Sequence, residues 1–132
     1  MRNYGDPSVT SADPLPALYP NAVASDDSTT YDFGAYTPDA VLVLLGNNDY
    51  STEPRPSREI FVPAYMKFVE RLHETYPDAT LFAACGWNCQ AECCEYVEEA
   101  AALLTTHGLE TTFVSVQGVL QFPEDEGCGS HP

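Results

Sequence analysis

Three residues with chemically useful side chains follow apolar or glycine-rich segments. Asn48 comes two residues after the apolar run "AVLVLLG", Trp87 comes two residues after "ATLFAAC", and His131 stands in the loop "GCGSHP". An asparagine amide can donate a hydrogen bond to a developing oxyanion, and one such donor lowers a reaction barrier by about 3–4 kcal/mol. A histidine can act as general base toward a hydroxyl nucleophile. These residue types therefore indicate acyl-transfer chemistry, provided that the fold brings them together.

The elements that must position these residues alternate along the chain. Short apolar runs predict strands at 40–46, 79–85 and 111–117. Apolar side chains at helical spacing predict helices from about Ser57 to Tyr76 and from about Ala91 to His107. The first strand is a continuous apolar run, which is typical of a strand buried on both faces. The order β-α-β-α-β predicts a parallel sheet with right-handed crossovers, whose carboxyl edge is where ligands bind in such folds.

The chain is predicted to form one partial domain, 1–132, with an irregular loop segment at 1–38 and a body at 39–132 that ends in the histidine loop. The first segment is rich in Pro, Asp, Ser and Thr, which favour turns, while its aromatic residues argue against disorder. Three strands and two helices cannot cover both faces and both edges of a sheet. We therefore expect an incomplete α/β fold with an uncovered face and poor stability.

The charge of the chain excludes several kinds of partner. Five basic and 20 acidic residues give a formal net charge of −15. This field repels phosphate backbones and anionic lipid, so we expect neither nucleic acid nor a membrane as partner. No apolar run approaches the roughly 20 residues of a membrane-spanning helix. The negative field does not repel a neutral or cationic ligand, so such a ligand is electrostatically easier to bind.

The cysteines favour disulfides over a metal site. All five lie between Cys85 and Cys128, and their odd number leaves one thiol without a partner in this chain. Such clustering indicates an oxidising compartment. Cys85–Cys94 would tie the exit of the second strand to the second helix, Cys89–Cys93 is the other local choice, and the sequence does not settle the connectivity. The C-x2-C pairs of structural zinc sites are absent, so we expect no metal or cofactor, and a zinc-binding protein is only a third interpretation.

Each candidate residue also has a purely structural interpretation. The stretch around Asn48 is a serviceable turn, because Gly and Asn both tolerate positive φ. A lone histidine such as His131 in a polar loop is commonly just solvated. Trp87 fits a half-buried aromatic residue as well as a platform for a sugar ring. Residue types alone therefore do not decide between a turn and a site.

The order of several sequence blocks resembles a known family. "PDAVLVLLGNNDYS" is similar to the third conserved block, G-x-N-D, of SGNH (GDSL-type) hydrolases, and "GCGSHP" is similar to their histidine block. "RNYGDP", "DPLPALYP", "ASDDSTTYDF", "CEYV" and "GC..HP" follow in the order seen in the carbohydrate esterase family 2 subgroup. Those enzymes are acetyl-xylan-type esterases, which remove acetyl groups from polysaccharides. The resemblance runs from Arg2 to Pro132 and implies a three-layer α/β/α, flavodoxin-like fold.

The resemblance also implies roles for individual residues. Asn48 matches the oxyanion-hole asparagine, Gly46 matches the glycine that shapes its turn, and His131 matches the catalytic base. Asp49 matches the last residue of the G-x-N-D block, where a loop-fixing role is expected. Asp49 and Trp87 are also the candidate substrate-binding residues.

Two departures from the family pattern matter for function. SGNH enzymes generally place an aspartate three residues before the histidine, where this chain has Cys128; this resembles the subgroup's Ser–His dyad, and a disulfide or packing role is expected for Cys128. The Gly-Asp-Ser block with the nucleophile, and the glycine of the second block, lie upstream of the matched region in the family. We therefore expect Met1 to be an internal residue of a longer protein.

The resemblance implies Ser–His deacetylation of an acetylated polysaccharide or oligosaccharide by a secreted parent protein, without a cofactor. The isolated chain is expected to be inactive because the nucleophile is missing from it. The alternative is a non-catalytic remnant that binds glycan through Trp87 and the N-terminal tyrosines. The sugar, the acyl group and the oligomeric state are not predicted.

Overall fold

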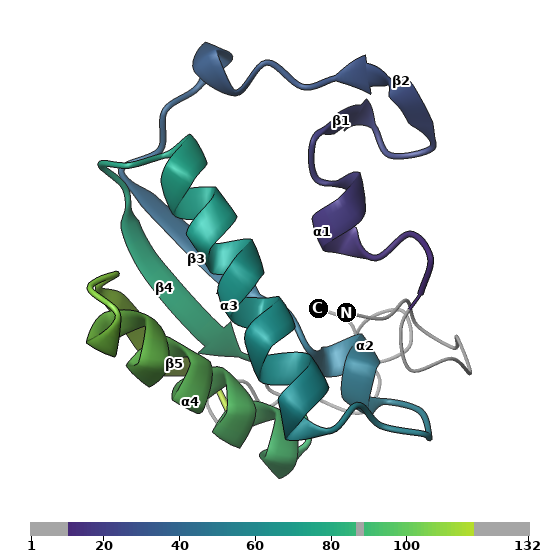
Figure 1. The fold of residues 1–132 in the computed structure, drawn as a ribbon, viewed down its shortest axis with the longest axis vertical. Coiled ribbons are helices and arrows are strands. Elements are labelled where there is room, and N and C mark those ends of the chain that lie inside the picture. The colour runs from purple at the N-terminus through teal and green to yellow at the C-terminus, as the bar shows by residue number, and fades with distance from the viewer. Residues whose placement is uncertain (1–10, 87–88, 118–132) are drawn as a thin grey trace, which may run out of the picture.

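The body of the protein is a parallel sheet with two long helices. The computed structural model describes residues 11–86 and 89–117. In these residues a three-stranded sheet has the order β3-β4-β5 (Figure 1). The strands are β3 (Ala40–Leu44), β4 (Thr80–Cys85) and β5 (Thr111–Ser115), and the helices between them are α3 (Arg58–Thr75) and α4 (Ala91–Thr106). This arrangement confirms the predicted α/β class and the order β-α-β-α-β.

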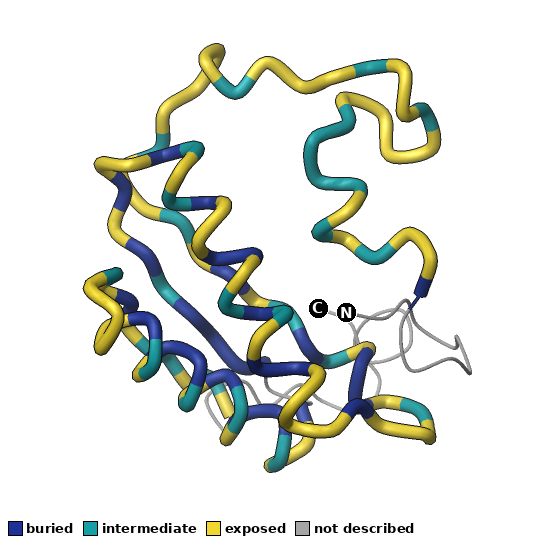
Figure 2. The backbone as a smooth tube through the Cα atoms, viewed as in Figure 1, coloured by how far each residue is buried: buried dark blue, intermediate teal, exposed yellow. Residues whose placement is uncertain are grey.

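Both long helices lie on the same face of the sheet (Figure 1). The strands follow one another in one direction across the sheet, and right-handed crossovers in one direction place every helix on one side. Their apolar stripes meet the inner face of the sheet, where Figure 2 shows the buried residues concentrated. The side chains that are completely buried there include Phe61, Tyr65, Cys93, Val97 and Leu104. The Tyr65 hydroxyl also donates a hydrogen bond to the Val43 carbonyl oxygen at 2.9 Å, which fastens α3 to β3.

The opposite face of β3 is open to solvent. Leu42 and Leu44 alternate with the buried Val43 and are 61% and 52% exposed. The prediction that this strand is buried on both faces is therefore wrong for the described residues. The apolar run indicated a sheet covered on two sides, whereas the two helices cover one side only. The expected uncovered face is present.

The N-terminal segment contains short regular elements where the sequence indicated irregular backbone. These are α1 (Leu15–Leu18), the antiparallel strands β1 (Asn21–Val23) and β2 (Asp26–Thr30), and the 3-10 helix η1 (Phe33–Ala35). Asp26 stabilises this hairpin by accepting hydrogen bonds from the backbone N–H of Ser28 at 3.0 Å and from its hydroxyl at 2.6 Å. Such local side-chain bonds leave no hydrophobic period in the sequence, which explains the difference.

Aromatic and cationic contacts anchor this segment on α3. The Tyr19 ring lies edge-on to Phe68 with 5.5 Å between ring centroids, and it stacks on Phe33 at 5.1 Å. Arg71 on α3 donates a hydrogen bond to the Pro16 carbonyl oxygen at 3.1 Å. Burial, reinforced by a hydrogen bond with Tyr76, raises the pKa of Tyr19 to about 12. Within the described part of the chain, no helix combines the length and apolarity needed to cross a membrane.

Candidate functional site

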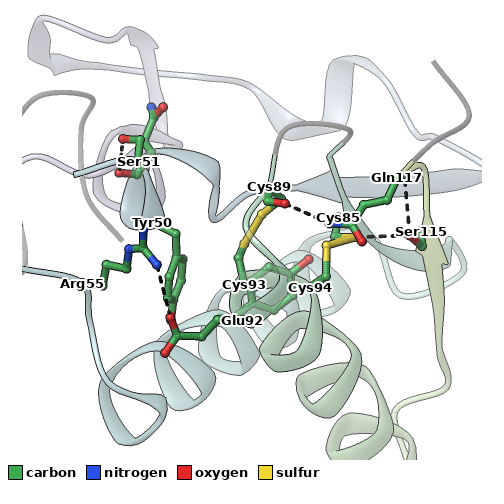
Figure 3. The surroundings of a disulfide bond; sticks show 12 residues. Tyr50, Ser51, Arg55, Cys85, Cys89, Glu92, Cys93, Cys94, Ser115 and Gln117 are labelled. Atoms are coloured by element: carbon green, nitrogen blue, oxygen red, sulfur yellow. Dashed lines mark hydrogen bonds and ion pairs between the residues drawn. A yellow bond between two sulfur atoms is a disulfide. The ribbon is translucent and has the colours of Figure 1, made fainter. Parts of the chain in front are cut away.

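The ends of the strands bring three separate segments to one edge of the sheet. Leu44, Ala84 and Val114 lie side by side in the parallel register of β3, β4 and β5. The chain therefore leaves the sheet at neighbouring points, through 45–51 after β3, 86–90 after β4 and 116–117 after β5. Figure 3 shows the side chains that gather there. The expected convergence of strand exits is confirmed for these segments.

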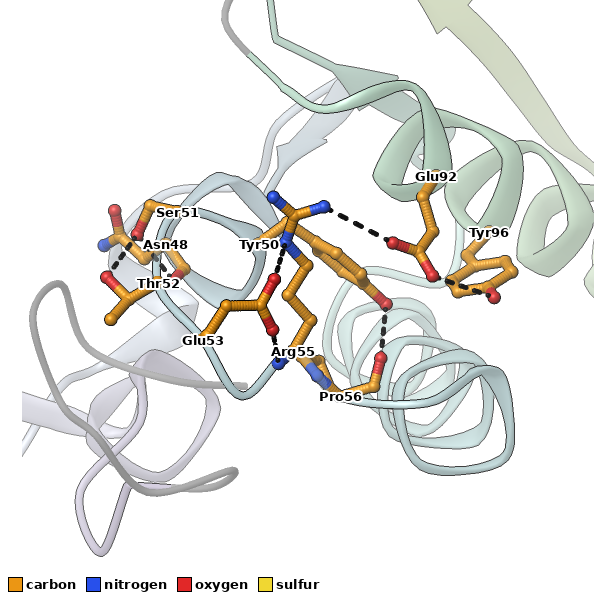
Figure 4. A network of polar contacts seen from close by, with 9 residues as sticks. All are labelled: Asn48, Tyr50, Ser51, Thr52, Glu53, Arg55, Pro56, Glu92 and Tyr96. Carbon is orange, nitrogen blue, oxygen red and sulfur yellow. Dashed lines mark hydrogen bonds and ion pairs between the residues drawn. The ribbon is translucent and has the colours of Figure 1, made fainter.

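Asn48 stands on a short helix that begins at the first exit. The helix α2 (Asn47–Tyr50) is capped by Gly46, whose φ is 116°, in the left-handed region that favours glycine. Asn48 is exposed, while Asp49 and Tyr50 are 2% and 0% exposed. The Ser51 hydroxyl donates a hydrogen bond to the Asn48 carbonyl oxygen at 2.9 Å (Figure 4). The turn therefore exposes Asn48 to solvent and buries the two residues that follow it, Asp49 and Tyr50.

Gly46 is fixed by the space around it as well as by its conformation. A Cβ atom at this position would lie 2.7 Å from Cys93 Sγ and 3.0 Å from Phe61 Cζ. Real Cβ atoms essentially never approach another atom to 2.7 Å, so the backbone of the turn is packed directly on the disulfide and the aromatic ring. Gly46 thus allows the turn to sit deep against α3 and α4.

The Tyr50 side chain forms the base of the turn. Its ring lies edge-on to Phe61 with 5.2 Å between centroids, and its hydroxyl donates a hydrogen bond to the Pro56 carbonyl oxygen at 3.2 Å. Burial, together with the charge of Glu92, raises the pKa of the Tyr50 hydroxyl, which stays protonated and keeps donating. Asp49, the residue before Tyr50, is buried as well.

An ion-pair network links the loop after α2 to the start of α4 (Figure 4). Arg55 lies 3.1 Å from Glu53 and 3.7 Å from Glu92, and the Tyr96 hydroxyl donates to Glu92 at 3.4 Å. Burial, together with the Glu92 charge, raises the pKa of Tyr96. Sequence reasoning missed this network; Arg55, a rare cation in an acidic chain, was the signal that could have found it.

Two disulfides lie beneath the exits of β3 and β4 (Figure 3). Cys85 pairs with Cys94, as the sequence suggested, and this bridge ties the end of β4 to α4. Cys89 pairs with Cys93, so the second local choice exists alongside the first. The clustering of cysteines predicted disulfides, and these two bridges confirm that prediction. No group of three or more His, Cys, Asp or Glu side chains within 11–86 and 89–117 is arranged to hold a metal ion.

Three of the residues singled out from sequence lie outside the described residues. These are Trp87, Cys128 and His131. The structure thus places Asn48, Gly46 and Asp49 in one turn at the carboxyl edge of the sheet. The meeting of Asn48 with His131, and of either with Trp87, stays a prediction.

Comparisons with known proteins give a consistent set of relatives, although no known family model matches the chain. The chain is 32% identical over 102 residues to the cellulase/esterase CelE of Acetivibrio thermocellus, and the match covers 74% of this chain and 12% of that protein. It is 29% identical over 141 residues to the acetylxylan esterase/glucomannan deacetylase of Cellvibrio japonicus, covering 100% of this chain and 38% of that protein.

Solved structures agree with these relatives. The fold is similar to that of a family two carbohydrate esterase from Clostridium thermocellum in complex with cellohexaose, with a TM-score of 0.72 and 30% identity. That match covers 87% of this chain and 35% of the other. The chain therefore spans well under half the length of each of these proteins.

Proposed function

We propose that this chain, whose relatives and structural neighbours are carbohydrate esterase family 2 enzymes, carries part of a Ser–His site that deacetylates carbohydrate. The observation that carries the proposal is the Gly46-capped turn, which exposes Asn48 at the edge of the sheet where α/β folds bind ligands. Asn48 is proposed as the oxyanion donor and His131 as the general base. Asp49, which is buried within the turn, is proposed to fix the loop.

The reaction is the hydrolysis of an acetyl ester in two stages. A serine hydroxyl attacks the acetyl carbonyl carbon, and His131 takes the hydroxyl proton. The Asn48 side-chain amide donates a hydrogen bond to the tetrahedral oxyanion, a contact worth about 3–4 kcal/mol of barrier. The histidine then gives its proton to the departing sugar alkoxide. Water repeats the same steps on the acyl-serine and releases acetate.

The electrostatics of the chain suit this substrate and this product. An acetylated sugar is neutral, so the formal charge of −15 does not oppose its approach. Acetate is an anion, and the same field favours its departure. The disulfides Cys85–Cys94 and Cys89–Cys93 suit a secreted parent protein, because such bonds persist in oxidising compartments.

The nucleophile is proposed to come from sequence outside this chain. Ser51 donates its hydroxyl proton to the Asn48 carbonyl oxygen, and Ser115 Oγ accepts a hydrogen bond from the Gln117 backbone N–H at 3.3 Å. Both rim serines are therefore engaged in holding the exits. The isolated chain is expected to hydrolyse no ester.

The test has two arms that use p-nitrophenyl acetate. The purified chain alone should release no p-nitrophenol above the buffer rate. A chimera that takes its upstream segment, with the nucleophile block, from the C. thermocellum family two esterase should be active. The His131→Ala variant of that chimera should lose activity, since the base contributes about 10²- to 10⁴-fold. Turnover by the isolated chain that His131→Ala abolishes would contradict the missing nucleophile.

A second candidate function is glycan binding without hydrolysis. It is favoured by the relative that was solved with cellohexaose and by aromatic side chains in the N-terminal segment, where Tyr36 is 66% exposed. Titration of the chain with cello- and xylo-oligosaccharides, monitored through the fluorescence of its single tryptophan, Trp87, separates the two functions. Saturable binding by the chain, together with a chimera that stays inactive, supports this second function.

A further inference from the structure

The two cysteines of one disulfide, Cys89 and Cys93, make contacts with all three strand exits at the rim of the candidate site. Figure 3 shows this disulfide and the hydrogen bond between Cys89 and Gln117. Cys93 Sγ lies against Gly46 in the first exit, 2.7 Å from the position that a Cβ atom would take. Cys89 belongs to the second exit. Its carbonyl oxygen accepts a hydrogen bond at 2.9 Å from Nε2 of Gln117, which lies in the third exit. The Cys89–Cys93 bridge therefore joins segments that the sequence separates by up to about 70 residues.

The other disulfide makes contacts of a different kind. Cys85–Cys94 connects the last residue of β4 to the first turn of α4, beneath the exits. Cys85 Sγ lies 3.5 Å from Ser115 Oγ, at the end of β5. This bridge fastens a strand to its neighbour and to a helix. Cys85–Cys94 therefore serves as a control. Both bridges connect the region at the end of β4 to α4, but Cys89–Cys93 is the one that contacts the turn that carries Asn48.

We propose that the Cys89–Cys93 disulfide positions the Asn48 turn and makes the candidate site sensitive to reduction. When the bridge is closed, Cys93 Sγ has one place, and the Gly46 backbone is packed against it. When the bridge is open, two non-bonded sulfur atoms need more separation than two bonded ones. The space beside Gly46 is already full, so the turn, the Cys89 loop or both must move.

The redox step needs a dithiol as reductant. One thiolate of the dithiol attacks a sulfur of the bridge and forms a mixed disulfide, and the second thiolate displaces the protein sulfur. The dithiol loses two electrons and becomes a cyclic disulfide. Cys89 and Cys93 gain those two electrons and two protons and become thiols. Both residues are buried, with Cys89 6% exposed and Cys93 fully buried, so the dithiol is expected to approach the bridge from the Cys89 side.

Hydrogen exchange on the chain itself tests the coupling. The Tyr50 N–H, which donates to the Gly46 carbonyl oxygen at 3.2 Å, reports on the turn. In Cys89→Ala/Cys93→Ala, exchange at Tyr50 should be faster by about tenfold or more, while the amides of β4 change by less than about threefold. The matched control, Cys85→Ala/Cys94→Ala, should speed exchange in β4 and α4 at least as much as at Tyr50. Adding dithiothreitol to this control opens Cys89–Cys93 and should then speed exchange at Tyr50 further, whereas no further change would refute the sensitivity to reduction. Unchanged exchange at Tyr50 in the first variant, or equal acceleration in β4, would overturn the proposal.

A second variant keeps the proposal testable if the double variant does not fold. Gln117 is exposed, so Gln117→Leu should fold with both bridges closed and should lose only the hydrogen bond to Cys89. The Cys89 N–H, which donates to the Gly86 carbonyl oxygen at 3.1 Å, should then exchange several-fold faster, with Tyr50 unchanged. No change at Cys89 would show that the third exit is not coupled to the bridge.

The inference depends on the proposed function only for the role of Asn48. Hydrogen exchange tests the coupling between the disulfide and the turn, and the kinetics of the chimera test the role of Asn48. In the active chimera, Cys89→Ala/Cys93→Ala should lower kcat by about tenfold with KM within about twofold, the pattern of a misplaced transition-state contact. Faster exchange at Tyr50 with an unchanged kcat would refute the role of Asn48 and leave the coupling intact. Unchanged exchange in an active chimera would refute the coupling and leave the esterase intact.

Discussion

Replacing Gly46 by alanine tests whether the Asn48 turn is packed as tightly as the structure indicates. The φ of 116° costs an L-residue about 1–2 kcal/mol. The new methyl group would overlap Cys93 Sγ and touch Phe61, and such overpacking costs about 1–3 kcal/mol. The sum is a loss of about 2–5 kcal/mol in the free energy of unfolding, a large part of the total for a domain of this size.

Gly108 provides a matched control for the conformational part. Its φ is 93°, but no atom lies within 4 Å of the position of a Cβ atom. Gly108→Ala should therefore cost only the backbone strain, about 1–2 kcal/mol. The difference between the two variants isolates the contact of Gly46 with the disulfide and the aromatic ring.

Urea denaturation followed by circular dichroism measures both variants. With an m value of about 2 kcal/mol/M, Gly46→Ala should lower the midpoint by about 1–2.5 M and Gly108→Ala by about 0.5–1 M. In the Cys89→Ala/Cys93→Ala background the cost of Gly46→Ala should shrink, because the sulfur is gone. Equal midpoints for the two glycine variants, or a cost that does not depend on Cys93, would refute the packing argument.

The remaining predictions concern the core, the pH dependence and the open face. Tyr65→Phe removes the hydrogen bond to the Val43 carbonyl oxygen and should lower the free energy of unfolding by about 1 kcal/mol. Tyr36→Phe, at an exposed site, should lower it by less than about 0.5 kcal/mol. The urea midpoints of the two variants measure the difference. The pKa of Tyr19 is about 12 in the folded protein against an ordinary 10.0, so its contribution to the free energy of unfolding is complete below pH 10 and is lost as the pH rises toward 12. A Tyr19→Phe variant should therefore show a shallower fall of stability in that range. An equal fall in both proteins would contradict this. Leu42→Lys on the open face should reduce binding of the dye ANS and self-association in light scattering without loss of stability, and unchanged dye binding would show that this face is not the exposed apolar surface.

The body of the fold could be predicted because each of its elements has a strong local signal. The stretch around Tyr65 and Val69 repeats at helical spacing, and the run before Gly46 is apolar with a glycine stop. The structure begins and ends these elements within two residues of the expected bounds. The side of the sheet that the helices cover could not be predicted in this way, because it depends on the strand order β3-β4-β5.

The short elements could not be predicted because polar side chains stabilise them. The hairpin around Asp26 depends on hydrogen bonds between neighbouring residues, and such bonds leave no period in the sequence. The four-residue helix at Asn47–Tyr50 begins at Gly46, and sequence reasoning expected only a turn there. How closely this helix packs against the body of the protein depends on Cys93 and Phe61, which are distant in sequence. Its position therefore could not be predicted from local signals.

The convergence of the strand exits could be predicted from the sequence, whereas the contacts made there could not. The sequence predicted that Asn48, Trp87 and His131 follow the strands at one edge, and the parallel register places Asn48 there together with Cys89 and Gln117. The pairing of the cysteines was left open, because sequence spacing allows several pairings. The structure shows both local bridges and thereby shows which of them touches the turn.

The kinetics of Asn48→Ala in the active chimera test the central claim most directly. The matched control is Asn47→Ala, one residue earlier on the same helix. The account predicts that Asn48→Ala lowers kcat for p-nitrophenyl acetate by about 10²- to 10³-fold with little change in KM, because the lost amide contacts the oxyanion and not the ground-state ester. Asn47→Ala should stay within about threefold of the parent. Equal losses for the two variants, or a kcat for Asn48→Ala close to that of the parent, would contradict the claim that this turn is an oxyanion hole.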